Sequence, residues 1–152
     1  SRGQSWALYG YAMMYRFTKN KKYLKQAVHI ADFILHHPNL PEDKIPFWDF
    51  DAPRIPSAKR DASAAAIMAS ALLELGRYTD GDKKREFVAS AETILESLSG
   101  ENYRARQGEN GGFLLLHSTG ALPMNSEVDV PLIYADYYFL EALKRYKDWY
   151  LD

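Results

Sequence analysis

Residues 61–75 have the sequence DASAAAIMASALLEL, which is almost entirely apolar after its first residue. Only Ser63, Ser70 and Glu74 interrupt the run of Ala, Ile, Met and Leu. A helix with no polar face must be covered on both sides by other parts of a protein. We therefore predict that residues 61–75 form an inner helix, capped at its start by the carboxylate of Asp61.

Four other segments show helical periodicity and fall into two kinds. Residues 23–35 and 87–98 carry apolar side chains at steps of three and four, with charged residues on the opposite face, which is typical of outer helices. Residues 6–17 are rich in aromatic residues and Met, and residues 130–146 pack many large apolar side chains into four turns. Both are predicted to be inner helices, so the order is inner, outer, inner, outer, inner.

Polar residues at the starts of these helices suggest caps. Asn20 and Asp82 can accept first-turn amides of the two outer helices, and Asp129 can do so for the last inner helix. Pro131 would then lie in the first turn, where a missing amide hydrogen is tolerated. Asp136 lies inside the same helix, where a buried charge needs partners. Tyr hydroxyls or an Arg from a neighbouring helix are the candidates.

The connections between helices alternate in length. Short turns near residues 18–21 and 78–81 lead from inner to outer helices, whereas residues 37–60 and 100–128 form long loops from outer to inner ones. Loops longer than roughly 12 to 15 residues are uncommon in compact domains and are often functional. We therefore expect the working edge where these loops lie. In the second loop, the apolar run 111–116 is predicted to be a short strand.

These features predict an all-α fold with two concentric helix layers in a single domain, residues 1–152. Inner helices begin near residues 2, 61 and 129, a spacing far wider than the period of about 34 residues in tetratricopeptide arrays. An incomplete (α/α)6 toroid made of helical hairpins, with at most a short β-hairpin in residues 100–128, fits better. Because the toroid is unclosed, we expect the faces of residues 6–17 and 134–139 to be exposed and to mediate self-association.

The composition excludes several functional classes. The 152 residues carry 19 Lys plus Arg and 20 Asp plus Glu, a formal net charge of −1, so the chain lacks the basic field typical of nucleic-acid binding. No apolar run reaches the about 20 residues that span a bilayer. The absence of Cys excludes disulfides and leaves both cytoplasm and periplasm open. No His or acidic spacing indicates a metal site, and no cofactor is expected.

Candidate binding residues lie near the helix starts and in the loops. Arg2 and Trp6 are four residues apart, so a helix places a guanidinium beside an indole. This pair suits a ligand with a carboxylate and a flat apolar side, such as a uronic sugar, although an Arg stacked on a core Trp is the simpler alternative. Trp48 with Asp49 and Asp51 mixes aromatic and carboxylate groups as sugar sites do, but the same carboxylates can form Asx turns.

Four motifs occur in an order that resembles one enzyme family. They are SRGQSWALYG at residues 1–10, FWDFDAP at 47–53, RDASAAA at 60–66 and EVDVPLIYADYY at 127–138. Together they cover essentially the whole chain, which resembles the unsaturated glucuronyl hydrolases of glycoside hydrolase family 88. The resemblance implies an (α/α)6 barrel and a role in bacterial glycosaminoglycan degradation.

The implied activity is release of an unsaturated (4,5-ene) uronic acid from the non-reducing end of oligosaccharides made by polysaccharide lyases. In this family an Asp protonates the C4=C5 vinyl ether and helps water to add at C5, so one carboxyl serves as acid and then as base. Neither a metal nor a nucleotide is required. The implied partner is an unsaturated oligosaccharide, with no nucleic acid and no membrane.

The resemblance also implies roles for individual residues. Arg2, Gln4 and Trp6 match the signature Trp-Ser-Arg-Gly-Gln-x-Trp, whose Arg and Trp line the subsite for the unsaturated uronate. His117 and Ser118 lie in a loop that matches the region reading the next sugar and any sulfate on it. The family's two catalytic Asp residues belong to its N-terminal half, and this chain begins inside the signature. The implied chain is thus a C-terminal part with no catalytic residue, inactive alone, whose substrate-binding residues are Arg2, Gln4, Trp6, Trp48, His117 and Ser118.

Two alternatives stay open at this point. The related unsaturated rhamnogalacturonyl hydrolases of family 105 share a similar barrel and chemistry, but they more often have Asn where this chain has Gln4, which favours the glucuronyl enzymes. A non-catalytic α-helical repeat or carbohydrate-binding module would also fit the helical pattern. Saturable sugar binding with short, equivalent loops would be its signature.

Overall fold

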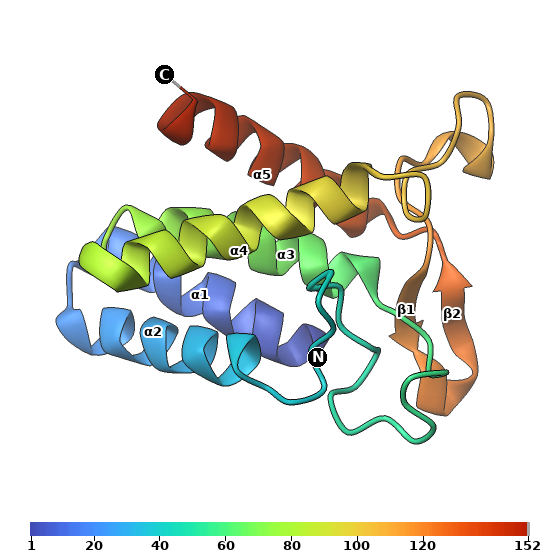
Figure 1. Ribbon diagram of the computed structural model, residues 1–152, viewed down its shortest axis with the longest axis horizontal. Helices are drawn as coiled ribbons and strands as arrows, with labels where there is room; N and C mark the ends of the chain where they lie inside the picture. The colour runs from blue at the N-terminus through green and yellow to red at the C-terminus, as the bar shows by residue number, and fades with distance from the viewer. Residues whose placement is uncertain (152) are drawn as a thin grey trace.

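The computed structural model describes residues 1–151 as a helical protein with one small β-hairpin (Figure 1). The helices are α1 (Arg2–Thr18), α2 (Lys21–Leu35), α3 (Ala62–Gly76), α4 (Gly81–Ser99) and α5 (Ile133–Tyr150). The antiparallel hairpin consists of β1 (Ser118–Ala121) and β2 (Ser126–Val130), and two short 3-10 helices cover Asn110–Gly112 and Leu122–Met124. Within these residues, no helix combines the length and the hydrophobicity needed to cross a bilayer.

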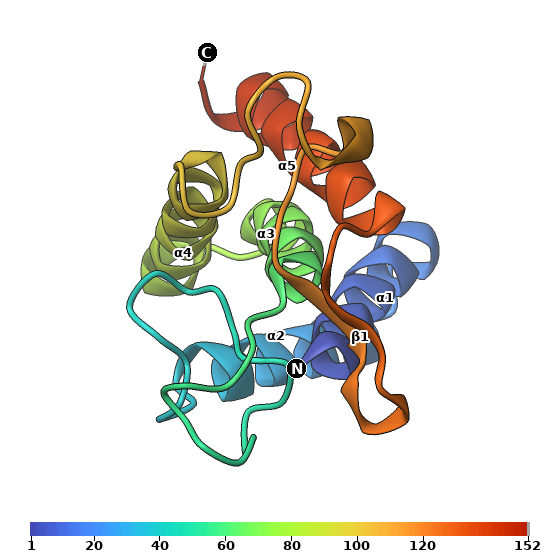
Figure 2. The ribbon, with the colours of Figure 1, turned by 90° about the vertical axis from the view of Figure 1, so that its right-hand side faces the viewer.

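Helix α3 lies at the centre of the molecule. Every residue from Ala62 to Gly76 is buried, and the helix packs against α1, α4 and α5. Viewed along its axis, α3 is surrounded by the other four helices (Figure 2). The prediction that residues 61–75 form a helix covered on both sides is therefore confirmed, as is the predicted mainly helical, toroid-like fold.

The two other inner helices, α1 and α5, are covered less completely than α3. Both α1 and α5 pack against α3, yet each leaves large apolar side chains open to solvent. These exposed residues are Trp6, Met14 and Phe17 on α1 and Ile133, Tyr137, Leu140 and Leu143 on α5. Within the predicted stretches, residues 6–17 thus expose apolar side chains, whereas residues 134–139 expose Tyr137 but bury Phe139. Leu143 lines a cavity beside Leu95 of α4, and we call the other six exposed residues the α1–α5 face.

The outer helices follow the amphipathic pattern, but only one of their predicted caps is correct. Asn20 caps α2, since its side chain accepts a hydrogen bond from the Lys22 amide at 3.0 Å. Asp82 does not cap α4: the helix begins one residue earlier, at Gly81, which places Asp82 inside its first turn. There its carboxylate pairs with Arg85 one turn further on.

The predicted start of the last inner helix is also wrong. Asp129 lies in β2 and Pro131 follows it, and α5 begins only at Ile133. Asp129 has a left-handed backbone (φ 57°), and its two carboxylate oxygens bind His117 and Lys59 instead of first-turn amides. A long-range pair therefore replaces the local cap.

The predicted strand at residues 111–116 does not form. Leu115 is buried but pairs only through an isolated bridge with Arg104, and the hairpin lies further along the chain. The carboxylate of Asp136 accepts hydrogen bonds from the amides of Leu114 (2.7 Å) and Leu115 (2.9 Å). The apolar run is therefore held by Asp136 and by the single bridge to Arg104. Asp136 has backbone amides as partners where Tyr hydroxyls or an Arg were predicted.

The fold gathers the starts of the inner helices at one end of the molecule. Helices α1, α3 and α5 all begin beside the hairpin and the long loop between α2 and α3, as Figure 1 shows. The expected working edge is thus an assembled surface, formed by three helix N-termini and two loops.

The central position of α3 leads to a stability prediction. Leu72 is fully buried, so Leu72→Ala should lower the free energy of unfolding by about 2 to 5 kcal/mol, through lost apolar burial and the remaining cavity. Urea denaturation followed by circular dichroism measures this change. Met124→Ala is the control, because Met124 is 83% exposed and its truncation should change stability by less than about 0.5 kcal/mol. Equal effects of the two substitutions would contradict the central placement of α3.

Candidate functional site

Arg2 joins three elements at the assembled end of the molecule. It lies in the first turn of α1, and its Nη1 donates hydrogen bonds to the carbonyl of Thr119 (3.1 Å) and the hydroxyl of Tyr134 (3.0 Å). Its Nη2 donates to the carbonyl of Gly120. Arg2 therefore ties α1 to β1 and to the start of α5, while 23% of its side chain stays accessible.

Trp6 lies one helical turn after Arg2 on the same face. Its ring packs against Tyr134, with centroids 6.3 Å apart, and edge-to-face against Tyr138 at 5.1 Å. The Arg2 guanidinium lies over the same Tyr134 ring, 5.7 Å from its centroid. The residue spacing predicted this shared face. With 37% of its surface exposed, Trp6 presents an open aromatic surface next to a cation.

Asp61 closes the inner side of this cluster. Its Oδ1 accepts hydrogen bonds from the Ser63 amide (3.1 Å), the Ser63 hydroxyl (2.5 Å) and the Thr119 amide (3.3 Å), so the predicted cap of the central helix is confirmed. Its Oδ2 lies 3.8 Å from Nη1 of Arg2. Burial raises the pKa of the Asp61 carboxyl, while the Ser63 hydrogen bond and the Arg2 charge act in the opposite direction.

Two predicted binding residues lie beside this cluster without joining it. Gln4 is exposed on the side of α1 that faces α2, where it lines a cavity of about 180 Å³ with Gln26 and His29. Trp48 is half-buried, and its amide donates to the Lys59 carbonyl at 2.9 Å. Its own carbonyl accepts from the Ser1 nitrogen at 3.3 Å, which places Trp48 near the start of α1.

His117 lines a separate polar cavity of about 530 Å³. Its Nδ1 lies 2.6 Å from Oδ1 of Asp129, whose Oδ2 accepts a hydrogen bond from Nζ of Lys59, also at 2.6 Å. Arg60 and Tyr103 complete this wall of the cavity. Burial alone would raise the pKa of Asp129, but its hydrogen bonds to Lys59 and His117 outweigh burial and lower it. His117 thus belongs to an ion-paired cluster of its own.

Ser118 follows His117 but is fully buried. Its hydroxyl has no hydrogen-bond partner among the residues that the structure describes. The six predicted binding residues are therefore not one constellation: only Arg2 and Trp6 form a shared surface.

Sequence reasoning missed Tyr134 and the carbonyls of β1 as partners of Arg2. Tyr134 lies in the apolar segment 130–146, a pattern that predicts no binding role for it, yet its hydroxyl and ring contact Arg2 and its ring contacts Trp6. The sequence pattern that could have identified Tyr134 is the set of three inner helices that start at one end. That pattern places the first-turn residues of α1 and α5 close together, and Tyr134 is in the first turn of α5.

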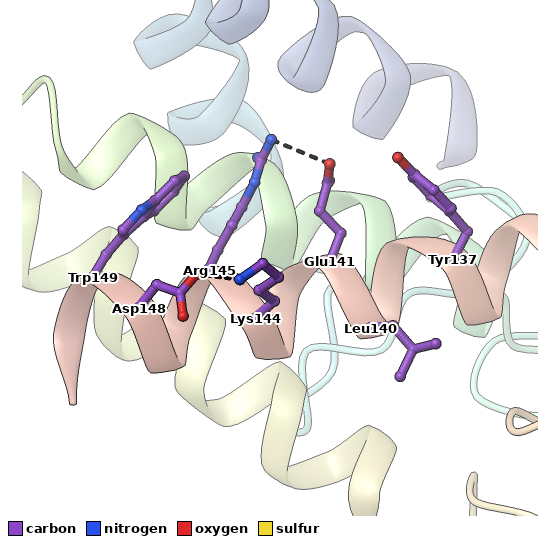
Figure 3. A pocket seen from close by; sticks show the side chains of 7 residues that line it. All are labelled: Tyr137, Leu140, Glu141, Lys144, Arg145, Asp148 and Trp149. Carbon is purple, nitrogen blue, oxygen red and sulfur yellow. Dashed lines mark hydrogen bonds and ion pairs between the residues drawn. The ribbon is translucent and has the colours of Figure 1, made fainter.

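A second polar network lies under the α1–α5 face. Arg145 of α5 donates to the Ser70 carbonyl (2.8 Å) and pairs with Glu74 (3.1 Å) and Glu141 (3.4 Å). The hydroxyl of Tyr9 donates to Glu141 at 3.1 Å, and burial raises the pKa of Tyr9 to about 12. This network joins α1, α3 and α5, and two of its members, Glu141 and Arg145, line an open cavity of about 560 Å³ along α5 (Figure 3).

The lowered pKa of Asp129 leads to a pH-dependent prediction. Asp129→Asn removes a carboxylate that is better stabilised in the folded than in the unfolded chain. The free energy of unfolding at neutral pH should fall by about 0.5 to 1 kcal/mol, a small amount because the Lys59–Asp129 pair is partly exposed. The difference should shrink as the pH falls below about 4 and vanish once the carboxyl is protonated in both states. Urea titrations across this range measure it.

Asp82→Asn is the matched control, because the Asp82 side chain is 95% exposed. Its effect should stay within about 0.5 kcal/mol at every pH. If the difference in free energy of unfolding between Asp129→Asn and the wild type did not change with pH, the Asp129 carboxylate would not be stabilised by folding.

The chain is similar in sequence to known enzymes. No family model matches the chain. An unsaturated glucuronyl hydrolase from Formosa agariphila is 52% identical over 145 residues, which are 95% of this chain but only 36% of that protein. The chain therefore spans little more than a third of the length of this relative.

Solved structures agree with the sequence comparison. An unsaturated glucuronyl hydrolase specific for heparin is 54% identical, with a TM-score of 0.94 over 97% of this chain and 39% of the other. A mutant of the Streptococcus agalactiae enzyme, complexed with dGlcA-GalNAc6S, is 34% identical with a TM-score of 0.87 over 97% of this chain and 39% of that one. Along almost its whole length, the chain is thus homologous to part of the unsaturated glucuronyl hydrolases of glycoside hydrolase family 88.

Proposed function

We propose that this chain forms part of the sugar-binding wall of a glycoside hydrolase that releases unsaturated (4,5-ene) uronic acids from lyase-generated oligosaccharides. One observation carries the proposal: Arg2 and Trp6 lie side by side on one open face, both against Tyr134. This face is at the end of the molecule where the three inner helices begin.

The chemistry of this face matches a 4,5-ene uronate. The sugar carries a carboxylate next to a ring that the C4=C5 double bond flattens. Within residues 1–151, Nε of Arg2 makes no hydrogen bond, so this edge of the guanidinium can donate to a carboxylate. The exposed indole of Trp6 offers an apolar plane for the flattened ring.

The remaining predicted residues receive different roles in the proposal. Trp48 and His117 lie at the same end of the molecule, and we assign them to sugars beyond the first. We assign no direct sugar contact to Gln4, which faces α2, or to Ser118, whose hydroxyl is buried. The proton donor for vinyl-ether hydration is proposed to lie in the part of the longer relatives that this chain does not match.

The relatives indicate a class of substrate. One of them is specific for heparin, and another was crystallised with dGlcA-GalNAc6S. We therefore propose an unsaturated uronyl disaccharide from a glycosaminoglycan as the ligand, bound at Arg2 through its carboxylate.

Binding and turnover should separate in this chain. Isothermal titration calorimetry with an unsaturated heparin disaccharide should show saturable binding, and Arg2→Met and Trp6→Ala should each weaken it at least tenfold, because each removes a direct contact. Arg85→Met on α4 should leave the affinity unchanged. The ultraviolet absorbance of the disaccharide should stay constant, since the chain lacks the proton donor. A measurable loss of that absorbance would contradict the placement of the proton donor outside this chain. Absence of binding would contradict the proposed site at Arg2 and Trp6.

The α1–α5 face is proposed to mediate association with a second copy of the chain. Two of its residues, Tyr137 and Leu140, line the open cavity along α5 together with Trp149 and the Lys144–Asp148 ion pair (Figure 3). Contiguous apolar patches of this kind are unusual on monomers and are typical of interaction surfaces. A second copy presents the same residues and is proposed to cover the face at Tyr137 and Leu140, leaving Trp6 open for the sugar.

Light scattering tests this association directly. The chain should run as a dimer or larger species at micromolar concentration, and the double variant Tyr137→Glu with Leu140→Glu should be monomeric because it places charges in the contact. Met124→Glu, which changes an exposed apolar residue of the hairpin tip, should leave the assembly unchanged. A monodisperse wild-type monomer would count against self-association.

A further inference from the structure

Asp61 makes more interactions than a helix cap requires. Asn20, the cap of α2, accepts one amide hydrogen bond. Asp61 accepts three hydrogen bonds through Oδ1 alone, and its fully buried Oδ2 faces the Arg2 guanidinium 3.8 Å away. All three hydrogen bonds end on Oδ1, and among the described residues Oδ2 makes none, so the second oxygen is left facing the Arg2 charge.

Asp61 and Arg2 hold the same strand residue from two sides. The amide of Thr119 donates to Asp61, and the carbonyl of Thr119 accepts from Arg2. The hydroxyl of Thr119 donates to the carbonyl of Arg60, which fixes β1 against the start of α3. The position of the Arg2 guanidinium is therefore set by a strand that Asp61 anchors, as well as by the charge of Asp61 itself.

The neighbouring residue shows that this strand has little freedom. A Cβ atom on Gly120 would lie 2.8 Å from Cβ of Glu127 on β2, closer than side chains tolerate. Gly120 also supplies the carbonyl that binds Nη2 of Arg2. The two strands are therefore packed closely where they hold the guanidinium.

We propose that Asp61 is a positioning residue for uronate recognition: its carboxylate fixes Arg2 so that the Nε edge of the guanidinium stays open for the sugar carboxylate. This inference rests on the proposed function for its consequence in binding, but the link between Asp61 and Arg2 exists in the free protein. The buried Asp61 carboxylate balances the charge of the partly accessible guanidinium before a sugar carboxylate is bound. Arg2 is thus held in one conformation before the ligand arrives.

The test compares variants that separate capping from positioning. Asp61→Asn keeps a side-chain oxygen that can accept from the Ser63 amide, but it removes the negative charge and places an NH2 group where Oδ2 faced Arg2. Asp61→Ser also keeps a good cap residue, and it removes both the charge and the group that faced Arg2. Asn20→Ala is the matched control, since it removes the cap of α2 far from Arg2.

The readout in the free chain is the Arg2 Nε–H signal in nitrogen-15 NMR. In the wild type we expect a dispersed resonance, assigned through its loss in Arg2→Met. In Asp61→Asn and Asp61→Ser it should move to the position of unrestrained arginines, and its nitrogen-15 relaxation should change to that of a mobile side chain. Asn20→Ala should lower the melting temperature without moving the signal. An unchanged Arg2 signal in both Asp61 variants would reduce Asp61 to a cap and overturn the proposal.

Ligand binding gives the second readout. Asp61→Asn should weaken the unsaturated disaccharide at least fivefold, and adding it to Arg2→Met should weaken binding no further, because Asp61 acts through Arg2. If Asp61→Asn weakened binding by the same factor in the wild type and in Arg2→Met, the proposal would be overturned. If the wild-type chain binds no disaccharide, the proposed function fails, while the Arg2 signal still decides whether Asp61 positions the guanidinium.

Discussion

The structure depends on the need to cover a helix that has no polar side. All residues of α3 from Ala62 to Gly76 are buried, so other helices must surround it. Helices α1, α4 and α5 do so, and α2 covers α1 from outside. Because α1 and α5 run in the same direction as α3, their first turns meet at one end. A requirement of hydrophobic burial thus creates the place where polar side chains from distant parts of the sequence come together.

The start of α3 links this packing to the candidate site. Asp61 caps the central helix, anchors β1 through the Thr119 amide and lies next to Arg2. Arg2 in turn binds β1 and Tyr134 of α5. Moving the start of α3 would therefore move the guanidinium as well. The same residues stabilise the fold and shape the surface beside Trp6, so stability and recognition are coupled at this end.

Local patterns predicted much of the fold, and long-range pairs decided the rest. Periodicity located the five helical segments, and the caps Asn20 and Asp61 followed from residues adjacent in sequence. Asp129 failed as a cap because His117 and Lys59, brought near only by the fold, bind its carboxylate. Residues 111–116 failed as a strand because the amides of Leu114 and Leu115 bind Asp136 on a helix more than 20 residues away. Likewise, a spacing of four placed Arg2 beside Trp6, but no local pattern could supply Tyr134 as their common neighbour.

Homology to part of the unsaturated glucuronyl hydrolases and the Arg2–Trp6 face support the same account, in which a sugar binds where the inner helices begin. A crystal structure of this chain soaked with an unsaturated uronyl disaccharide tests that account most directly. The account predicts density for the uronate carboxylate at Nε of Arg2 and for the flattened ring over Trp6. Density confined to the cavity of His117 and Asp129, with Arg2 and Trp6 unoccupied, would contradict it.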